Sequence, residues 1–189
     1  MRKSKIKILS CGVAWPGQYL RMMKTHYLDR NGNPGHWEFI SRKGVVFIFP
    51  ITPDGIVVLI RQYRIPQNSF VIEMPAGVCD KDGESKEETA RRELREETGY
   101  AADKLIEVRP IRAASAAISG EVNIFLGLNA RRVGEPSFDE SEDIEILEVP
   151  FKELLTFLMS QPPKIIIDSN VIAVWSMVKE LRLVGKKNA

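Results

Sequence analysis

Three glutamates lie close together within residues 92–97, in the run Arg-Glu-Leu-Arg-Glu-Glu. The spacing of Glu93, Glu96 and Glu97, at i, i+3 and i+4, places the three carboxylates on roughly one face of a helix. Like charges this close repel each other, which raises carboxylate pKa values and destabilises an isolated helix by roughly several tenths of a kcal/mol. A divalent cation would offset this repulsion. The cluster therefore predicts a metal site, with a solvated charged helix face as the alternative.

Magnesium is the cation that such a cluster favours. Mg2+ prefers oxygen ligands, retains several waters and commonly bridges protein carboxylates to substrate phosphates. Ions bound in this way activate water and neutralise the charge of a departing phosphate. The predicted cofactor is therefore Mg2+, with Mn2+ as a substitute, and the predicted chemistry is hydrolysis at phosphorus.

The residues around the cluster form a longer pattern that resembles the Nudix box, G-x5-E-x7-R-E-U-x-E-E-x-G-U, where U is a bulky apolar residue. The match is complete from Glu84 to Tyr100 when Tyr100 is accepted as U. Six residues instead of five separate Gly77 from Glu84, and we interpret the extra one as an insertion in the loop 79–83. The box marks hydrolases that act on a nucleoside diphosphate linked to another moiety, so the resemblance implies that fold and that activity.

The same resemblance implies roles for individual residues. Glu93 and Glu97 are expected to be metal ligands, with the carbonyl oxygen of Ala76 as a further ligand. Glu96 is expected either to bind the metal or to contact a metal-bound water, so Glu96 and Glu97 also stand among the expected catalytic residues. Arg92 is expected to orient the carboxylates, since a guanidinium holds them through paired hydrogen bonds.

Two motifs ahead of the box point to one branch of the family. Residues 61–64 (Arg-Gln-Tyr-Arg) and 72–77 (Ile-Glu-Met-Pro-Ala-Gly) are similar to sequences of ADP-ribose and nucleotide-sugar pyrophosphatases. The resemblance implies that Arg64 and Glu73 bind substrate, Arg64 by meeting a phosphate or a base edge; an ordinary surface arginine is the alternative.

Further along the chain, a glutamate on a loop well after the box often positions the water in this branch. Residues 138–144 resemble that acidic loop, with Glu142 as the first candidate and Glu140 as the second. A departure bears on the substrate: the branch usually carries Ser-Pro-Gly about sixteen residues after the box, whereas this chain has Ser115-Ala116-Ala117. The missing proline argues against ADP-ribose specifically and leaves GDP-mannose or ADP-glucose open.

The resemblance also implies a base-binding set in the N-terminal segment. In relatives that cleave ADP-ribose, a tryptophan followed by glutamate, with arginine further along, clasps the base across a dimer interface, and Trp37, Glu38 and Arg42 resemble this set. An indole that stacks on a base contributes about 1 to 3 kcal/mol in nucleic-acid complexes, and a glutamate can accept from an exocyclic amine. The alternative is an ordinary core tryptophan on a strand.

Hydrophobic patterning predicts the elements that must position these residues. A turn at residues 52–55 predicts a hairpin, and Ser85 with Glu88 forms a capping box at the start of a helix that Gly99 ends. Mixed in this order, the elements indicate an α/β sandwich around a mixed sheet, with a small N-terminal antiparallel sheet. The resemblance implies that this is the Nudix-type α/β/α sandwich. Strands are predicted at 5–11, 19–28, 36–42, 45–51, 56–63, 70–74, 105–111, 122–128 and 144–149, and helices at 85–98, 151–160 and 169–183.

Length and composition set the remaining expectations. With 189 residues we expect one main domain, residues 44–189, preceded by the sheet of residues 1–43, which serves dimerisation and base binding. A net charge of +2 argues against a nucleic-acid partner, and no apolar run approaches the ~20 residues of a membrane span. Cys11 and Cys79 form neither a zinc motif nor a disulfide framework, which favours the cytoplasm.

The sequence therefore predicts a homodimeric, Mg2+-dependent hydrolase of nucleoside diphosphate sugars. The products would be a nucleoside monophosphate and a sugar phosphate. Two alternatives remain open at this point: a Nudix-fold sensor that binds a nucleotide sugar without cleaving it, and a hydrolase of another nucleotide class, such as dinucleoside polyphosphates.

Overall fold

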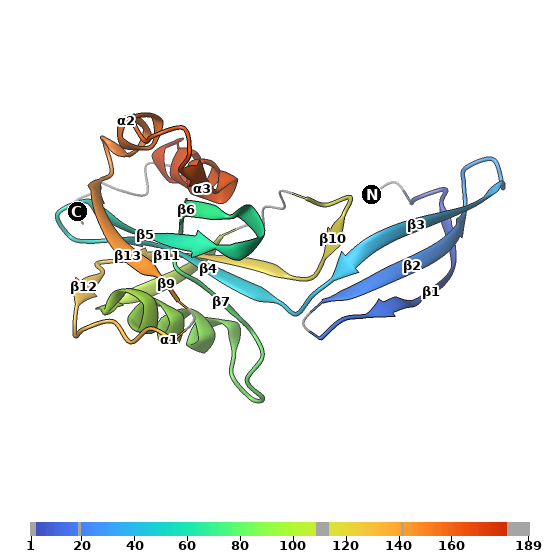
Figure 1. Cartoon of the computed structure of the whole chain (residues 1–189), viewed down its shortest axis with the longest axis horizontal. Coiled ribbons are helices and arrows are strands. Elements are labelled where there is room, and N and C mark those ends of the chain that lie inside the picture. Colours follow the sequence, from blue (N-terminus) through green and yellow to red (C-terminus); the bar gives the residue numbers. More distant parts are fainter. Residues whose placement is uncertain (1–2, 19, 109–113, 141, 181–189) are drawn as a thin grey trace. The chain divides into compact units, whose positions relative to one another are not determined.

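A computed structural model describes residues 3–18, 20–108, 114–140 and 142–180 of the chain (Figure 1). The chain divides into two compact units. The first, here the N-terminal unit, comprises residues 1–44 together with residues 114–121. The second, here the main unit, comprises residues 45–113 and 122–189.

The N-terminal unit is a four-stranded sheet in the order β1-β2-β3-β10. The first three strands form an antiparallel meander, and β10 pairs with β3 in parallel. The first strand is longer than predicted because two register shifts, at Ile8/Ser10 and Val13/Trp15, let pairing continue past Gly12. The strands are β1 (Lys7–Pro16), β2 (Arg21–Leu28), β3 (Pro34–Ser41) and β10 (Ile118–Ser119).

The segment that contains β10 is tied to β3 although it lies far away in the sequence. The indole Nε1 of Trp37 donates to the carbonyl oxygen of Ala116 at 2.8 Å. The backbone N–H of Ile40 donates to the carbonyl oxygen of Ala117, also at 2.8 Å. The segment that lacks the expected proline therefore directly contacts the tryptophan of the predicted base-binding set.

The main unit is built on an eight-stranded mixed sheet with helices on both faces (Figure 1). Its central path runs β14-β6-β5-β4-β11-β9, while β13 pairs with β5 and β7 pairs with β4. A separate two-stranded ladder joins β8 (Tyr100–Ala101) and β12 (Arg131–Arg132). The strands of the main sheet are β4 (Val45–Ile51), β5 (Ile56–Arg64), β6 (Ser69–Glu73), β7 (Ala76–Val78), β9 (Lys104–Val108), β11 (Val122–Leu128), β13 (Ile144–Pro150) and β14 (Ile166–Ile167).

The predicted hairpin between β4 and β5 is only partly correct. The chain turns at residues 52–55, but the ladder between the two strands is confined to Ile51 and Val57. Beyond that point β6 takes the place beside β5, and β7 takes the place beside β4. The two strands therefore diverge, and the chain crosses between them at Met74 and Pro75.

Each face of the main sheet has its own hydrophobic core. On one face, α2 (Leu154–Met159) and α3 (Ser169–Glu180) cover Phe49, Leu59 and Ile72, and α3 contributes the predicted apolar side chains, among them Val174. On the other face, α1 (Lys86–Thr98) buries Leu94 and Ala90 against alternate residues of β4 and β5. The predicted α/β sandwich is thus the observed architecture.

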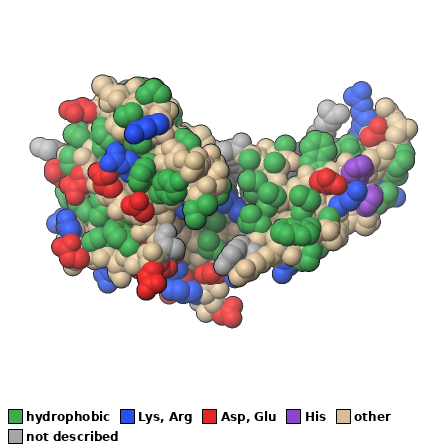
Figure 2. All heavy atoms as spheres, in the orientation of Figure 1, with side chains coloured by type: hydrophobic (Ala, Val, Ile, Leu, Met, Phe, Trp, Pro, Cys, Tyr) green, Lys and Arg blue, Asp and Glu red, His purple; other side chains and the backbone are tan. Residues whose placement is uncertain are grey.

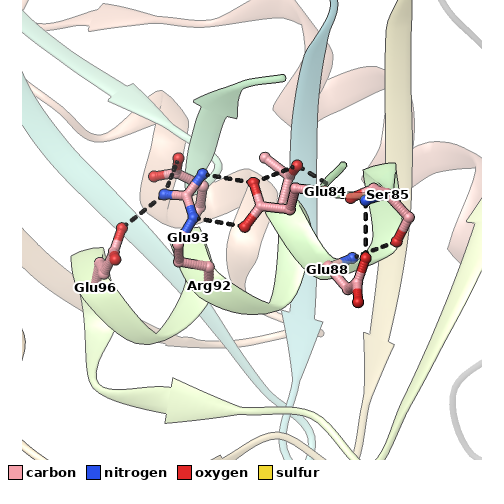
Figure 3. A network of polar contacts seen from close by, with 7 residues as sticks. Glu84, Ser85, Glu88, Arg92, Glu93 and Glu96 are labelled. Atoms are coloured by element: carbon pink, nitrogen blue, oxygen red, sulfur yellow. Dashed lines mark hydrogen bonds and ion pairs between the residues drawn. The ribbon is translucent and has the colours of Figure 1, made fainter. Parts of the chain in front are cut away.

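The helix α1 begins and ends where its sequence predicts. The Ser85 side chain accepts from the Glu88 N–H at 3.2 Å, and the Glu88 carboxylate accepts from the Ser85 N–H at 2.8 Å (Figure 3). Gly99 ends the helix with φ of 72°, which a residue without Cβ adopts without strain. The carboxylate-bearing helix is therefore fixed at both ends by local sequence.

Other boundaries differ from the predictions. The helix predicted from Phe151 begins three residues later, after a turn in which the Glu153 N–H donates to the Pro150 carbonyl oxygen. The last residues of the strand predicted at 105–111 and of the helix predicted at 169–183 lie outside the described residues. Strands of two or three residues, such as β7, were missed because they are too short to show a period. No helix in the described parts of the chain is long and apolar enough to cross a membrane.

Candidate active site

A pocket of about 510 Å3 lies in the main unit. Its walls come from the end of β5, from β7 and the loop that follows it, from α1, and from the segment that leads into β13. Because β4 and β5 diverge, β7 can pair with β4 at the wall of this pocket. The lining residues are Gln62, Arg64, Ala76, Gly77, Val78, Asp80, Lys81, Arg92, Glu93, Glu96, Glu97, Ser137, Asp139 and Glu142.

The guanidinium of Arg92 holds the carboxylates of the helix in place. It donates to Glu84 at 2.9 and 3.1 Å from one side, and its Nη1 donates to Glu93 at 2.7 Å and to Glu96 at 2.8 Å from the other (Figure 3). The hydrogen bonding that Arg92 donates to Glu84 is the largest cause of the raised pKa of Arg92, and the same interaction lowers the pKa of Glu84. Arg92 thus orients Glu93 and Glu96, as the resemblance implied.

Glu97 is the most deeply buried carboxylate of the pocket, with 4% of its surface exposed. Burial raises the pKa of Glu97 to about 8; the backbone N–H of Ala76, which donates to Glu97 at 2.8 Å, opposes this, while the charges of Glu93 and Glu142 add to it. Burial also raises the pKa of Glu93. In the absence of a cation, this site therefore holds its carboxylates at an energetic cost.

Gly77 leaves the space that Glu93 occupies. A Cβ atom at Gly77 would lie 2.0 Å from Cδ of Glu93 and 2.1 Å from its Oε1. A side chain at position 77 would therefore force the carboxyl end of Glu93 to move, so the first residue of the Nudix pattern helps to set the position of this glutamate.

The acidic loop brings Glu142 to the pocket. Its Oε2 accepts from the backbone N–H of Asp139 at 2.8 Å, and its own N–H donates to the Asp139 carbonyl oxygen at 2.9 Å. Glu142 also contributes to the electrostatic environment of Glu93 and Glu97. Glu140 does not line the pocket. Of the two glutamates expected from the acidic loop, Glu142 is therefore the one that lies at the pocket.

Arg64 and Glu73 form one unit, but only Arg64 lines the pocket. Arg64 Nε donates to Glu73 Oε1 at 2.7 Å, and Glu73 is buried behind it with 5% of its surface exposed. Burial raises the pKa of Glu73 although the arginine opposes this. Glu73, predicted to bind substrate, does not line the pocket itself, but its carboxylate holds Arg64, which does.

Several lining residues were not predicted. Asp139 and Gln62 lie within motifs that the sequence singled out, but neither had been given a role. Asp80 and Lys81 come from the loop with the inserted residue, and Ser137 had no signal in the sequence. Its N–H donates to the carbonyl oxygen of Glu96 at 2.7 Å, a contact between distant segments.

The predicted base-binding residues all lie in the N-terminal unit. Trp37 is 52% exposed and Glu38 pairs with Lys24 at 3.5 Å. As neighbours on β3, Trp37 and Glu38 point to opposite faces of the sheet. Arg42 lines a separate pocket of about 390 Å3 together with Arg21, and no described residue accepts a hydrogen bond from its buried Nε.

The chemistry of the main pocket fits a hard divalent cation. Glu93, Glu96, Glu97 and Ala76 offer oxygen atoms to one pocket, which is the donor set that such ions prefer. Across the described ranges, no three His, Cys, Asp or Glu side chains are already arranged as ligands. The reason is local, because Arg92 engages Glu93 and Glu96 while Glu97 accepts from Ala76.

Comparison with known proteins decides the family. A family model described as the NUDIX domain matches residues 41–169, a range that includes every residue lining the pocket. This chain belongs to the Nudix family. The resemblance seen in the box is thereby confirmed, and Nudix hydrolases generally need a divalent metal ion, in keeping with the carboxylate cluster.

Two curated relatives and one solved structure place this Nudix chain more closely. It is 33% identical over 132 residues to an ADP-ribose pyrophosphatase of Bacillus subtilis (strain 168), covering 69% of this chain and 71% of the relative. It is 31% identical over 159 residues to an ADP-sugar pyrophosphatase of Mus musculus, covering 75% and 72%. A crystal structure of an ADP compounds hydrolase shares the fold, with a TM-score of 0.78, 24% identity and 96% coverage of both chains.

The raised pKa of Glu97 predicts how metal-free stability depends on pH. With its pKa raised to about 8, Glu97 should keep its proton in the folded protein up to about that pH, whereas the unfolded chain releases it near the ordinary value of 4.5. The folded state thus binds more protons between these values, so the free energy of unfolding should fall as pH rises from about 5 to 8.

Thermal unfolding in EDTA, measured across this pH range, should show a smaller decline in stability for Glu97→Gln than for the wild type. Glu87→Gln, an exposed change on the same helix, should follow the wild type, and parallel wild-type and Glu97→Gln curves would contradict this assignment.

The steric role of Gly77 predicts a loss of metal affinity in Gly77→Ala. The new Cβ must displace Glu93, and disturbing the groups that orient a ligand typically costs about 10- to 100-fold in metal affinity. Titration with Mn2+, followed by its paramagnetic resonance signal, would measure the change. Gly134→Ala is the matched control, because a Cβ there meets no atom within 4 Å. Equal affinities in the two variants would rule out the steric role of Gly77.

Proposed function

We propose that this Nudix protein hydrolyses the pyrophosphate bond of nucleoside diphosphate sugars, such as ADP-ribose or GDP-mannose, to a nucleoside monophosphate and a sugar phosphate. The observation that carries the proposal is the meeting of Glu93, Glu96 and Glu97 with Glu142 in one pocket. The relatives named ADP-ribose and ADP-sugar pyrophosphatases support this substrate class, as does a GDP-mannose pyrophosphatase of Yersinia enterocolitica that is 30% identical over 123 residues.

Glu93, Glu97 and the Ala76 carbonyl oxygen would hold Mg2+, with Mn2+ able to replace it, and Glu96 would bind the ion or one of its waters. When bound, the metal supplies charge neutralisation for the pyrophosphate and acidifies water. The buried position of Glu97 suits this role, since a cation removes the cost of its ionisation. Arg92 keeps Glu93 and Glu96 oriented through hydrogen bonds of 2.7 and 2.8 Å.

Glu142 would take the proton of the attacking water. Its carboxylate is held by the Asp139 N–H through one oxygen, which leaves the other for the water. Arg64, fixed from behind by Glu73, would contact a phosphate of the substrate. No covalent enzyme intermediate is required, since the water attacks phosphorus directly.

The N-terminal unit would bind the base in a homodimer. Hydrophobic side chains gather over β1, β2 and β3 (Figure 2), among them the exposed Trp15, Val13 and Met22. Every residue of β1 is exposed, and its outer edge is unpaired within the described chain. Such a surface supports association with a second copy. We further propose that the protein acts in the cytoplasm, where the thiols of Cys11 and Cys79 would stay reduced.

The proposed activity predicts hydrolysis of at least one member of a panel of ADP-ribose, GDP-mannose, ADP-glucose and UDP-glucose in the presence of Mg2+. Glu97→Gln should lower kcat on the order of 100-fold or more, because it removes a charged ligand without changing shape. Product analysis by ion-exchange chromatography measures both. Retained binding of the substrate by the inactive variant would support an enzyme, whereas a wild-type protein that binds but cleaves none of the panel would favour the sensor alternative.

The proposed base site predicts that Trp37→Ala raises KM roughly 5- to 150-fold, corresponding to about 1–3 kcal/mol of stacking. If Trp37 serves the active site of the partner subunit, mixing the Trp37→Ala protein with the Glu97→Gln protein should restore activity at low substrate concentration. In the mixed dimer, one active site has Glu97 from the first variant and Trp37 from the second, so both residues of that site are intact. A monomer by light scattering, or mixtures no more active than their components, would contradict the shared site.

A further inference from the structure

The carboxamide oxygen of Gln62 is buried without a partner. The residue is 6% exposed, and its Oε1 is fully buried without a hydrogen bond. Such an atom destabilises the folded protein as long as it stays unpaired. An orphan of this kind calls for a partner that binds later, such as a water or a ligand.

The position of Gln62 indicates where that partner would lie. Side chains alternate between the two faces of a strand, and Gln62 follows Val58 by four residues on β5. Its side chain therefore points to the same face as Val58, the face that α1 covers. Across the neighbouring edge it pairs with Ile144, and the adjacent Tyr63 N–H donates to the Asp143 carbonyl oxygen at 3.1 Å. Gln62 therefore lies beside the point where the segment carrying Glu142 enters the sheet, and both residues line the same pocket.

Most of the side-chain acceptors that line the pocket are charged carboxylates. An attacking water has two hydrogens, of which Glu142 can take one as a proton. A further carboxylate beside it would repel the pyrophosphate, whereas a carboxamide oxygen accepts a hydrogen bond without removing the proton. Gln62 lines the pocket with such a carboxamide, whose oxygen and nitrogen exchange places by a half-turn when a water binds. Glutamine side chains orient attacking water in the same way in GTP-hydrolysing enzymes.

We propose that Gln62 accepts a hydrogen bond from the attacking water and aligns it between Glu142 and the phosphorus atom. The water oxygen then forms its bond to phosphorus while the bond from phosphorus to the bridging oxygen breaks. The electron pair departs with the bridging oxygen, and the proton passes to Glu142. Gln62 gains and loses no proton. This inference rests on the proposed hydrolase function and adds a catalytic residue to it.

The test is Gln62→Met, which keeps the length of the side chain and removes the acceptor. We expect kcat to fall about 10- to 100-fold while KM changes by less than about twofold. The loss should be the same at every pH, because Gln62 does not titrate. The melting temperature of the metal-free variant should equal or exceed that of the wild type, since an unpaired buried polar group is lost. Gln62→Leu provides the same comparison if Gln62→Met does not fold.

Asn123→Leu is the matched control for a carboxamide that is buried but satisfied. Asn123 is 3% exposed, accepts from Lys86 at 3.0 Å and donates to the Val45 carbonyl oxygen at 3.3 Å. Its replacement should lower the melting temperature and leave kcat nearly unchanged, the opposite of the Gln62 pattern.

Three outcomes would overturn the role of Gln62. A rise in KM at constant kcat would make it a substrate contact, recovery of kcat at another pH would make it a modulator of Glu142, and unchanged kinetics would leave it without a role. The wild type in the same assay tests the proposed function separately. A wild type inactive on the panel refutes the hydrolase, whereas an active wild type with equally active Gln62 variants refutes only this inference.

Discussion

The cost of holding several carboxylates in one partly buried pocket is the constraint on which the rest of this structure depends. Glu97 retains a raised pKa of about 8 because burial disfavours its charge, and its acidic neighbours add to the effect. Arg92 offsets part of the repulsion by bonding to Glu93 and Glu96, and the caps at Ser85 and Gly99 stabilise the helix from its ends. Stability is thus given up at the place where a cation and a pyrophosphate are to bind.

The divergence of β4 and β5 creates the space for this pocket. If the hairpin were paired along its whole length, no strand could lie between its arms. Because β6 and β7 occupy that place, Ala76 meets the end of α1 and Gly77 makes room for Glu93. Glu142 and Gln62 reach the same pocket through the pairing of β13 with β5. Sheet topology therefore gathers side chains from four stretches of the chain.

The proposed function separates base recognition from the metal chemistry along the chain. The segment near Ala116 belongs to the N-terminal unit, where its carbonyl oxygen accepts a hydrogen bond from the indole of Trp37. The carboxylates of α1 belong to the main unit. A change in the segment near Ala116, such as the missing proline, can thus alter the position of the tryptophan while the carboxylate cluster stays as it is.

The sequence by itself determined what is local. Helix α1, its caps and the shared face of Glu93, Glu96 and Glu97 follow from spacing within one turn or two, and β4 and β11 follow from continuous apolar runs. Only the tertiary structure decided what depends on pairing between distant segments. The diverging hairpin, the place of Glu142 in the pocket and the unpaired Oε1 of Gln62 are of this kind, because strand register and burial are set by contacts that no local pattern encodes.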